Sequence, residues 1–194
     1  MRIIALSECR TMPWKNGGGS TTEIAIHPPG ASLDEFDWRI STAHVGQDGP
    51  FSSFPGIDRT LAVLSGMGIA LAFGDGGTVQ LSPNSKPCAF AGDRAVEGRL
   101  VAGPIDDLNV MTRRGRWRHD MTRLAGPGPI HVEPGGDLMV LVARSAGWMI
   151  VAGRKREYLE AGDSVVLERS DHAVLTSEGD GEVFATNLWT DGSR

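Results

Sequence analysis

The stretch TLAVLSGMGIALAF, residues 60–73, contains two short apolar runs separated by a turn with two glycines. Similar runs recur along the chain, from RIIAL at 2–6 to EVFATNLWT at 182–190, with Gly, Pro, Asp or Ser at their ends. Runs punctuated in this way are typical of strands, and no segment keeps an apolar stripe at helical spacing over three turns. The pattern predicts an all-β protein built as a sandwich or a barrel.

The chain also resembles itself. DLMVLVARSAGWMIV at 137–151 follows the pattern of residues 60–73, and TNLWT at 186–190 follows that of DLNVMTR at 107–113. A Gly-Asp pair lies between these anchors in each half, at 92–93 and at 162–163. Two copies of one β-unit explain this economically, but short strands also align by chance, so the pattern alone leaves a duplicated double-stranded β-helix open.

Composition narrows the classes of partner. The 194 residues (20.7 kDa) suit one large domain or two small ones, and the net charge of −5 gives no reason to expect a nucleic-acid partner. We interpret the cationic run RRGRWRH at 113–119 as a solvated interdomain linker. The first residues lack a secretory apolar run, no stretch approaches the ~20 apolar residues of a membrane span, and Cys9 and Cys88 form no C-x-x-C motif. These features predict a cytoplasmic protein with no membrane partner.

Three segments together resemble the HutD/Ves family: PWKNGGGSTTEIAI at 13–26, FDWRISTAHVGQDGPFSSFPGIDRTLAVLSG at 36–66, and DDLNVMTRR at 106–114. The resemblance is dense over residues 11–113 and thin afterwards, where AGDSVVLERSDHAVL at 161–175 is similar to a cupin strand pair. It implies a bicupin, with two double-stranded β-helix (jelly-roll) barrels at 1–115 and 116–194, the first holding the candidate pocket. It also implies a link to histidine utilisation, without an established reaction.

The histidines do not follow the metal-binding pattern of catalytic cupins. Those proteins hold a divalent cation through a His-x-His pair, a following Glu and a distant His. Here no histidine stands two residues from another, and His172, where a last ligand would fall, has no partner histidine in its half. We therefore predict neither a metal nor a cofactor. The isolated histidines are His27, His44, His119, His131 and His172.

The loop PWKNGGG presents an aromatic ring, a cation and an amide just before three glycines. Consecutive glycines let a ligand approach main-chain N–H groups, so Trp14, Lys15, Asn16, Gly17 and Gly18 are candidate binding residues. A phosphate loop would place the lysine after the glycines and before a helix, which argues against a nucleotide site. The alternative is a barrel-edge turn in which the tryptophan packs and residues 21–23 begin a strand.

Two strand segments add polar side chains on one face each. In WRIS, alternation places Arg39 and Ser41 on the face opposite Trp38 and Ile40, either outside the barrel or inside the cup. In DDLNVMTRR, alternation separates the side of residues 107 and 109 from the apolar side of 108 and 110. A solvated outer face is the alternative to a polar cup wall in both cases.

The loop GPFSSFPG at 49–56 presents Phe51 and Phe54 and ends close to Arg59, which is placed to meet a carboxylate bidentately. The complement to these groups is a small anionic molecule. The candidate ligand-binding residues are Trp14, Lys15, Asn16, Gly17, Gly18, Arg39, Ser41, His44, Phe51, Arg59, Asp107 and Asn109.

Three functions follow as hypotheses. The first is a metal-free small-molecule binding protein that senses or buffers an acid of histidine breakdown, such as formylglutamate or urocanate, and so regulates histidine utilisation. The alternative is a cofactor-free cupin enzyme, an isomerase or hydrolase of a small organic acid, with His44, Glu23 or Asp107 as the base. A purely structural or protein-interaction role is the third, and a homodimer is the default assembly.

Overall fold

The computed structural model describes residues 1–177 and 179–192, and its regular structure is β apart from one short 3-10 turn, η1 (Leu6–Glu8). The chain forms two compact units. We call residues 10–118 the continuous barrel. We call residues 1–9 together with the described residues from 119 onward the discontinuous barrel.

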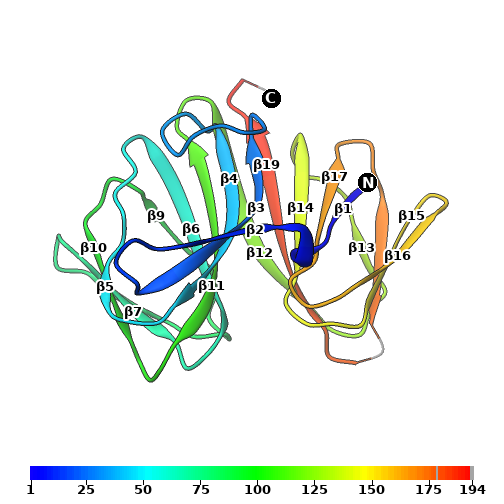
Figure 1. Cartoon of the computed structure of the whole chain (residues 1–194). Coiled ribbons are helices and arrows are strands. Elements are labelled where there is room, and N and C mark those ends of the chain that lie inside the picture. The colour runs from blue at the N-terminus through cyan, green and yellow to red at the C-terminus, as the bar shows by residue number, and fades with distance from the viewer. Residues whose placement is uncertain (178, 193–194) are drawn as a thin grey trace. The chain divides into compact units, whose positions relative to one another are not determined.

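The continuous barrel contains a six-stranded and a four-stranded sheet (Figure 1). The six-stranded sheet has the order β2 (Arg10–Pro13), β3 (Gly19–His27), β4 (Trp38–Val45), β11 (Ile105–Arg113), β6 (Ile57–Ser65), β9 (Cys88–Ala91). The four-stranded sheet has the order β5 (Gly49–Pro50), β10 (Val96–Leu100), β7 (Ile69–Phe73), β8 (Thr78–Leu81).

The discontinuous barrel contains a five-stranded and a four-stranded sheet. The first has the order β1 (Arg2–Ile4), β17 (Ser164–Glu168), β14 (Leu138–Ala143), β19 (Glu182–Thr190), β12 (Trp117–Ala125). The second has the order β13 (Ile130–Val132), β18 (Ala173–Ser177), β15 (Trp148–Ala152), β16 (Lys155–Leu159).

The strand orders show the duplication directly. The run β9-β6-β11-β4 in one barrel corresponds to β17-β14-β19-β12 in the other, and β5-β10-β7-β8 corresponds to β13-β18-β15-β16. In the matched runs each strand of the second copy lies eight places further along the chain than its counterpart. The all-β bicupin fold expected from the sequence is therefore confirmed.

The N-terminal strand belongs to the discontinuous barrel. β1 pairs antiparallel with β17, where Arg2 is opposite Val166, and the Leu6 amide donates to Asp163 Oδ1 at 2.9 Å. The predicted boundary after residue 115 leaves residues 1–9 in the N-terminal barrel. Their position in the structure follows from a pairing between segments about 160 residues apart, which the run RIIAL does not encode locally.

The cationic run at 113–119 contains a tight turn at Gly115 rather than a solvated linker, and the boundary between the units falls inside the run. Its arginines bind nearby acceptors. Arg113 donates to the Phe36 and Asp34 carbonyls, Arg114 pairs with Asp58 and Asp93, and Arg116 pairs with Asp37. The positive charges of this run therefore stabilise the turn and the neighbouring loops of the continuous barrel.

Among the described residues, the interior of the continuous barrel includes two apolar clusters. The larger includes Leu61, Val63, Ile69 and Leu71, and the smaller is formed by Phe36, Ile57 and Met111. On β6, residues 57 and 61 belong to different clusters, and Arg59 lies between them. A polar layer therefore separates the two clusters.

Candidate functional site

Three neighbouring strands bring the polar layer together. On β11, Met111 is opposite both Arg39 of β4 and Arg59 of β6, and Asn109 is opposite Ser41 of β4. Alternate residues of a strand share a face, so Asp107 and Asn109 lie on the same side as Met111, which packs in the barrel interior. The polar groups that share this interior face are all buried: Arg39, Ser41, Arg59, Asp107 and Asn109.

Arg59 is 4% exposed and lies among aromatic rings. Its guanidinium carbon is 5.4 Å, 5.5 Å and 5.2 Å from the ring centroids of Phe51, Phe54 and Phe90. Nε donates to Asn109 Oδ1 at 3.4 Å, and Nη1 donates to the Ser52 carbonyl at 3.1 Å. Within residues 1–177 and 179–192, Arg59 forms no ion pair with a carboxylate. Burial lowers the pKa of Arg59 to about 10, so the side chain remains a cation at neutral pH.

Asp107 is the buried carboxyl of the same layer, 1% exposed. Its Oδ1 has no hydrogen-bond partner among the described residues. Burial raises the pKa of Asp107 to about 7, with Arg59 acting in the opposite direction and Asp106 adding to the rise. An unpaired buried acceptor costs about 1–3 kcal/mol, so the fold carries a penalty at this position.

Arg39 shows how the fold normally compensates a buried cation. Its Nε lies 2.8 Å from Glu23 Oε2, although Arg39 itself is only 5% exposed. Glu23 reaches this position from β3 next to a register shift between residues 23 and 25. The sequence suggested that both arginines supply donors to a ligand, but the structure pairs Arg39 with a protein carboxylate and leaves Arg59 without one in the part of the chain it describes.

A glycine makes room for the aromatic wall around Arg59. Gly98 of β10 faces Phe51, and a Cβ at this position would lie 2.6 Å from the Phe51 ring. No side chain fits there unless the ring moves. The backbone of β10 therefore holds Phe51 against the guanidinium.

The glycine-rich loop forms the turn between β2 and β3. Trp14 Nε1 donates to Thr21 Oγ1 at 2.8 Å, and the ring packs against the larger apolar cluster. Asn16 Oδ1 accepts from the Gly18 amide at 3.1 Å, and Gly17 adopts a φ of 72°. Lys15 and Asn16 are exposed, and no hydrogen bond or ion pair within the described residues joins them to Arg59. This is the barrel-edge turn left open above, and ligand binding by residues 14–18 stays a prediction.

His44 lies on the other face of β4 from Arg39 and Ser41. Its Nδ1 is 2.9 Å from Asp106 Oδ1, and its side chain is 54% exposed. Strand alternation already gives this result, because 44 differs in parity from 39 and 41. His44 therefore does not join the interior polar layer.

Sequence reasoning missed two parts of the arginine environment. Phe90 reaches Arg59 because β6 pairs with β9, where the two residues are directly opposite. The Ser52 carbonyl reaches it because the loop folds back over the strand that follows. Neither contact has a local sequence signal. Phe54, the third ring beside Arg59, lies in the loop at 49–56 that the sequence already indicated.

The discontinuous barrel shows that the cupin fold needs no polar layer. Its interior cluster is apolar, and on β14 and β19, the counterparts of β6 and β11, the buried inward residues are Met139, Leu141, Ala143, Val183 and Ala185. Asn187, further along the same face of β19, is half-buried and accepts from the Gly135 amide. The buried polar side chains among its described residues, Ser164 and Thr186, alternate with core residues and so lie on the opposite strand faces. Charged groups inside the continuous barrel are thus a property of that copy.

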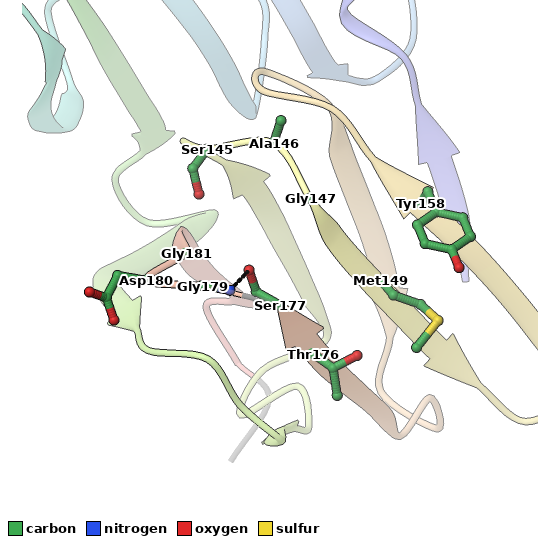
Figure 2. A pocket seen from close by; sticks show the side chains of 10 residues that line it. All are labelled: Ser145, Ala146, Gly147, Met149, Tyr158, Thr176, Ser177, Gly179, Asp180 and Gly181. Atoms are coloured by element: carbon green, nitrogen blue, oxygen red, sulfur yellow. Dashed lines mark hydrogen bonds between the residues drawn. The ribbon is translucent and has the colours of Figure 1, made fainter.

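A surface hollow of about 520 Å³ lies on the discontinuous barrel (Figure 2). Tyr158 and Met149 stand on one side of it, and Ser177 Oγ accepts from the Gly179 amide at 3.4 Å. Asp180 is a charged lining residue, and no described cation lines the hollow. It lacks the converging charges of the arginine layer and does not suit an anion. The lining residues described are Ser145, Ala146, Gly147, Met149, Tyr158, Thr176, Ser177, Gly179, Asp180 and Gly181.

No group of three or more His, Cys, Asp or Glu side chains in residues 1–177 and 179–192 is arranged to hold a metal ion. His172 Nδ1 lies 3.1 Å from Glu133 Oε1, and both side chains are exposed. In the same residues, no helix combines the length and apolarity needed to cross a membrane.

The duplicated sheets define the chain as a bicupin. The HutD family model matches residues 6–185, and the chain therefore belongs to the HutD family. It is 39% identical to Protein Ves of Citrobacter koseri over 115 aligned residues, and this alignment covers 57% of this chain and 59% of that protein. The HutD/Ves resemblance seen in the sequence is confirmed.

Two solved structures match nearly the whole chain. A conserved protein of unknown function from Pseudomonas aeruginosa PAO1 is 34% identical with a TM-score of 0.89, covering 96% of this chain and 97% of that one. HutD from Pseudomonas fluorescens SBW25, described for a formate condition, is 29% identical with a TM-score of 0.83, covering 98% and 99%.

Proposed function

We propose that this protein binds a small carboxylate at Arg59 inside the continuous barrel. One observation carries the proposal. A buried guanidinium, enclosed by three aromatic rings, forms no ion pair with a carboxylate in the described chain, while the interior cluster of the other barrel is apolar.

The electrostatics favour an anion. A buried cation is costly unless an opposite charge compensates it, as Glu23 compensates Arg39. A ligand carboxylate would supply that charge through charge-assisted hydrogen bonds, and the planar guanidinium suits a bidentate pair. The phenylalanine rings exclude water from the site, which strengthens the attraction.

The biological role follows as part of the same proposal. The family resemblance links the chain to histidine utilisation, whose breakdown products include small carboxylic acids. Formylglutamate and urocanate are therefore the first acids to test. We propose that binding senses or buffers such an acid and thereby regulates its breakdown.

Thermal shift and calorimetry with protein treated with a chelator test the proposal. Formylglutamate, urocanate, glutamate and histidine are compared on the wild type, on Arg59→Gln and on Arg94→Gln, a control with a half-exposed arginine of the same barrel. A ligand at about 100 times its Kd stabilises the native state by about 2.7 kcal/mol, a shift of several degrees. Loss of the shift in Arg59→Gln but not in Arg94→Gln supports the site, whereas an equal shift in all three proteins, or none in the wild type, refutes it.

A second candidate function is a cofactor-free enzyme with Asp107 as the base. The observation in its favour is a buried carboxyl in the same layer as a cation, with burial raising its pKa to about 7, an arrangement suited to proton transfer on a small acid. Turnover by chelated protein that is lost in Asp107→Asn and kept in His44→Ala would establish it. Turnover lost only in His44→Ala would contradict it, since His44 faces away from the layer.

A further inference from the structure

The orphaned oxygen of Asp107 carries information about the ligand. Oδ1 is fully buried and accepts no hydrogen bond from any described residue. Buried acceptors in native proteins are almost always paired, so an unpaired one calls for a specific explanation, such as a catalytic role or a bound partner. An ionised carboxylate oxygen can only accept, so the partner of the ionised form is a hydrogen-bond donor.

The strand register places this acceptor on the same wall as the arginine. Asn109 lies between the two groups on β11, and its Oδ1 already accepts from Arg59 Nε. Asp107 is the next inward residue along β11, roughly 7 Å further. Arg59 and Asp107 each affect the pKa of the other, which places their charges within electrostatic reach.

We infer that the acid bound at Arg59 carries an N–H or O–H donor a few bonds from its carboxylate, and that Asp107 Oδ1 accepts this hydrogen. The inference rests on the proposed function and narrows its ligand class. Plain alkyl carboxylates pair with Arg59 alone. N-acyl amino acids, hydroxy acids and azole carboxylic acids carry both a carboxylate for Arg59 and a donor for Asp107.

Oδ1 can accept in both charge states of Asp107. An ionised carboxylate accepts through either oxygen, and a carboxyl protonated on Oδ2 still accepts through Oδ1. An asparagine at the same position would accept through its amide oxygen, while a leucine of similar size would not. These two substitutions therefore separate hydrogen bonding from charge.

Matched ligand pairs test the inference by calorimetry. Urocanate is compared with 3-(2-furyl)acrylate, in which a furan replaces the N–H ring, and N-formylglutamate with N-formyl-N-methylglutamate. We expect at least one N–H acid to bind about 10-fold more tightly than its partner, because the partner leaves the buried oxygen unpaired. Asp107→Leu should abolish this preference and Asp107→Asn should keep it, with circular dichroism verifying that both variants fold.

The outcomes separate the two levels of the argument. Equal binding of both members of each pair to the wild type, or an unchanged preference in Asp107→Leu, overturns the donor inference and leaves a carboxylate site at Arg59 intact. No binding of any of the four acids overturns the proposed function, and the inference with it. If Asp107→Leu does not fold, loss of the preference in Asp107→Asn overturns the inference and its retention supports it.

Discussion

Replacing Asp107 with asparagine is expected to change how the stability of the protein depends on pH. The carboxyl has a pKa of about 7 in the folded chain, against 3.8 for an ordinary aspartate, because burial disfavours its charged form. Between these two values the folded state binds a proton that the unfolded state has released. The stability of the wild type therefore falls as pH rises from about 4 to about 7.

The size of the effect follows from the shift. One pKa unit corresponds to about 1.4 kcal/mol, so roughly three units give at most about 4 kcal/mol. Asparagine has a similar shape and no charge to bury. Relative to the wild type, Asp107→Asn should become more stable by up to about 1.4 kcal/mol per pH unit over this range, and the difference should level off at higher pH.

Urea unfolding followed by tryptophan fluorescence at several values between about pH 4.5 and about pH 8.5 measures this difference. Asp34→Asn, which removes an exposed carboxylate of the same barrel, is the control and should give a flat difference. A flat difference for Asp107→Asn as well would refute the reasoning, because it would mean that folding does not raise the pKa of Asp107.

Three further results are expected. Ligand affinity should fall above about pH 7, by at most about tenfold per pH unit, because a bound anion raises the pKa of Asp107 further, against the opposing effect of Arg59. The other charges nearby are Asp106 and the Arg39–Glu23 pair. Calorimetry in buffers of different ionisation enthalpy detects the proton taken up on binding, and Asp107→Asn should show no such uptake. Glu23→Gln should cost about 2 kcal/mol in urea unfolding because it leaves Arg39 buried without its anion, and a cost near zero would contradict the pairing. Gly98→Ala should cost about 1–3 kcal/mol and weaken ligand binding because the new methyl group displaces Phe51, whereas Gly49→Ala, opposite it in the ladder and open to space, should stay within about 0.5 kcal/mol; equal costs would contradict the packing described.

The all-β class could be predicted because its signals are local: short apolar runs with glycine and proline between them indicate strands and turns. The internal repetition left the duplication open, and the expectation of a bicupin came from the resemblance to the HutD/Ves family. The position of β1 could not be predicted in the same way, since its partner β17 begins at residue 164 and no local feature of RIIAL names it.

The site divides along the same line. Alternation correctly groups Arg39 with Ser41 and Asp107 with Asn109, and it also separates His44 from them. The pairing of residues across neighbouring strands could not be predicted from the sequence. The Glu23–Arg39 ion pair lies next to a register shift in β3, and Phe90 contacts Arg59 because the edge strand β9 pairs with β6. A sequence shows which side chains share a face but not which charge lies opposite which.

The membership of β1 in the discontinuous barrel affects how the chain is made. A ribosome releases β1 first, then every strand of the continuous barrel, and only afterwards the other strands of the sheet that β1 completes. Residues 10–118 can therefore fold during translation, while the discontinuous barrel, whose segments flank them in the sequence, is completed only when its last strand, β19, is made. If synthesis stalled after residue 118, residues 10–118 would form one complete domain, and the N-terminal residues 1–9 would lack β17, the strand with which β1 pairs.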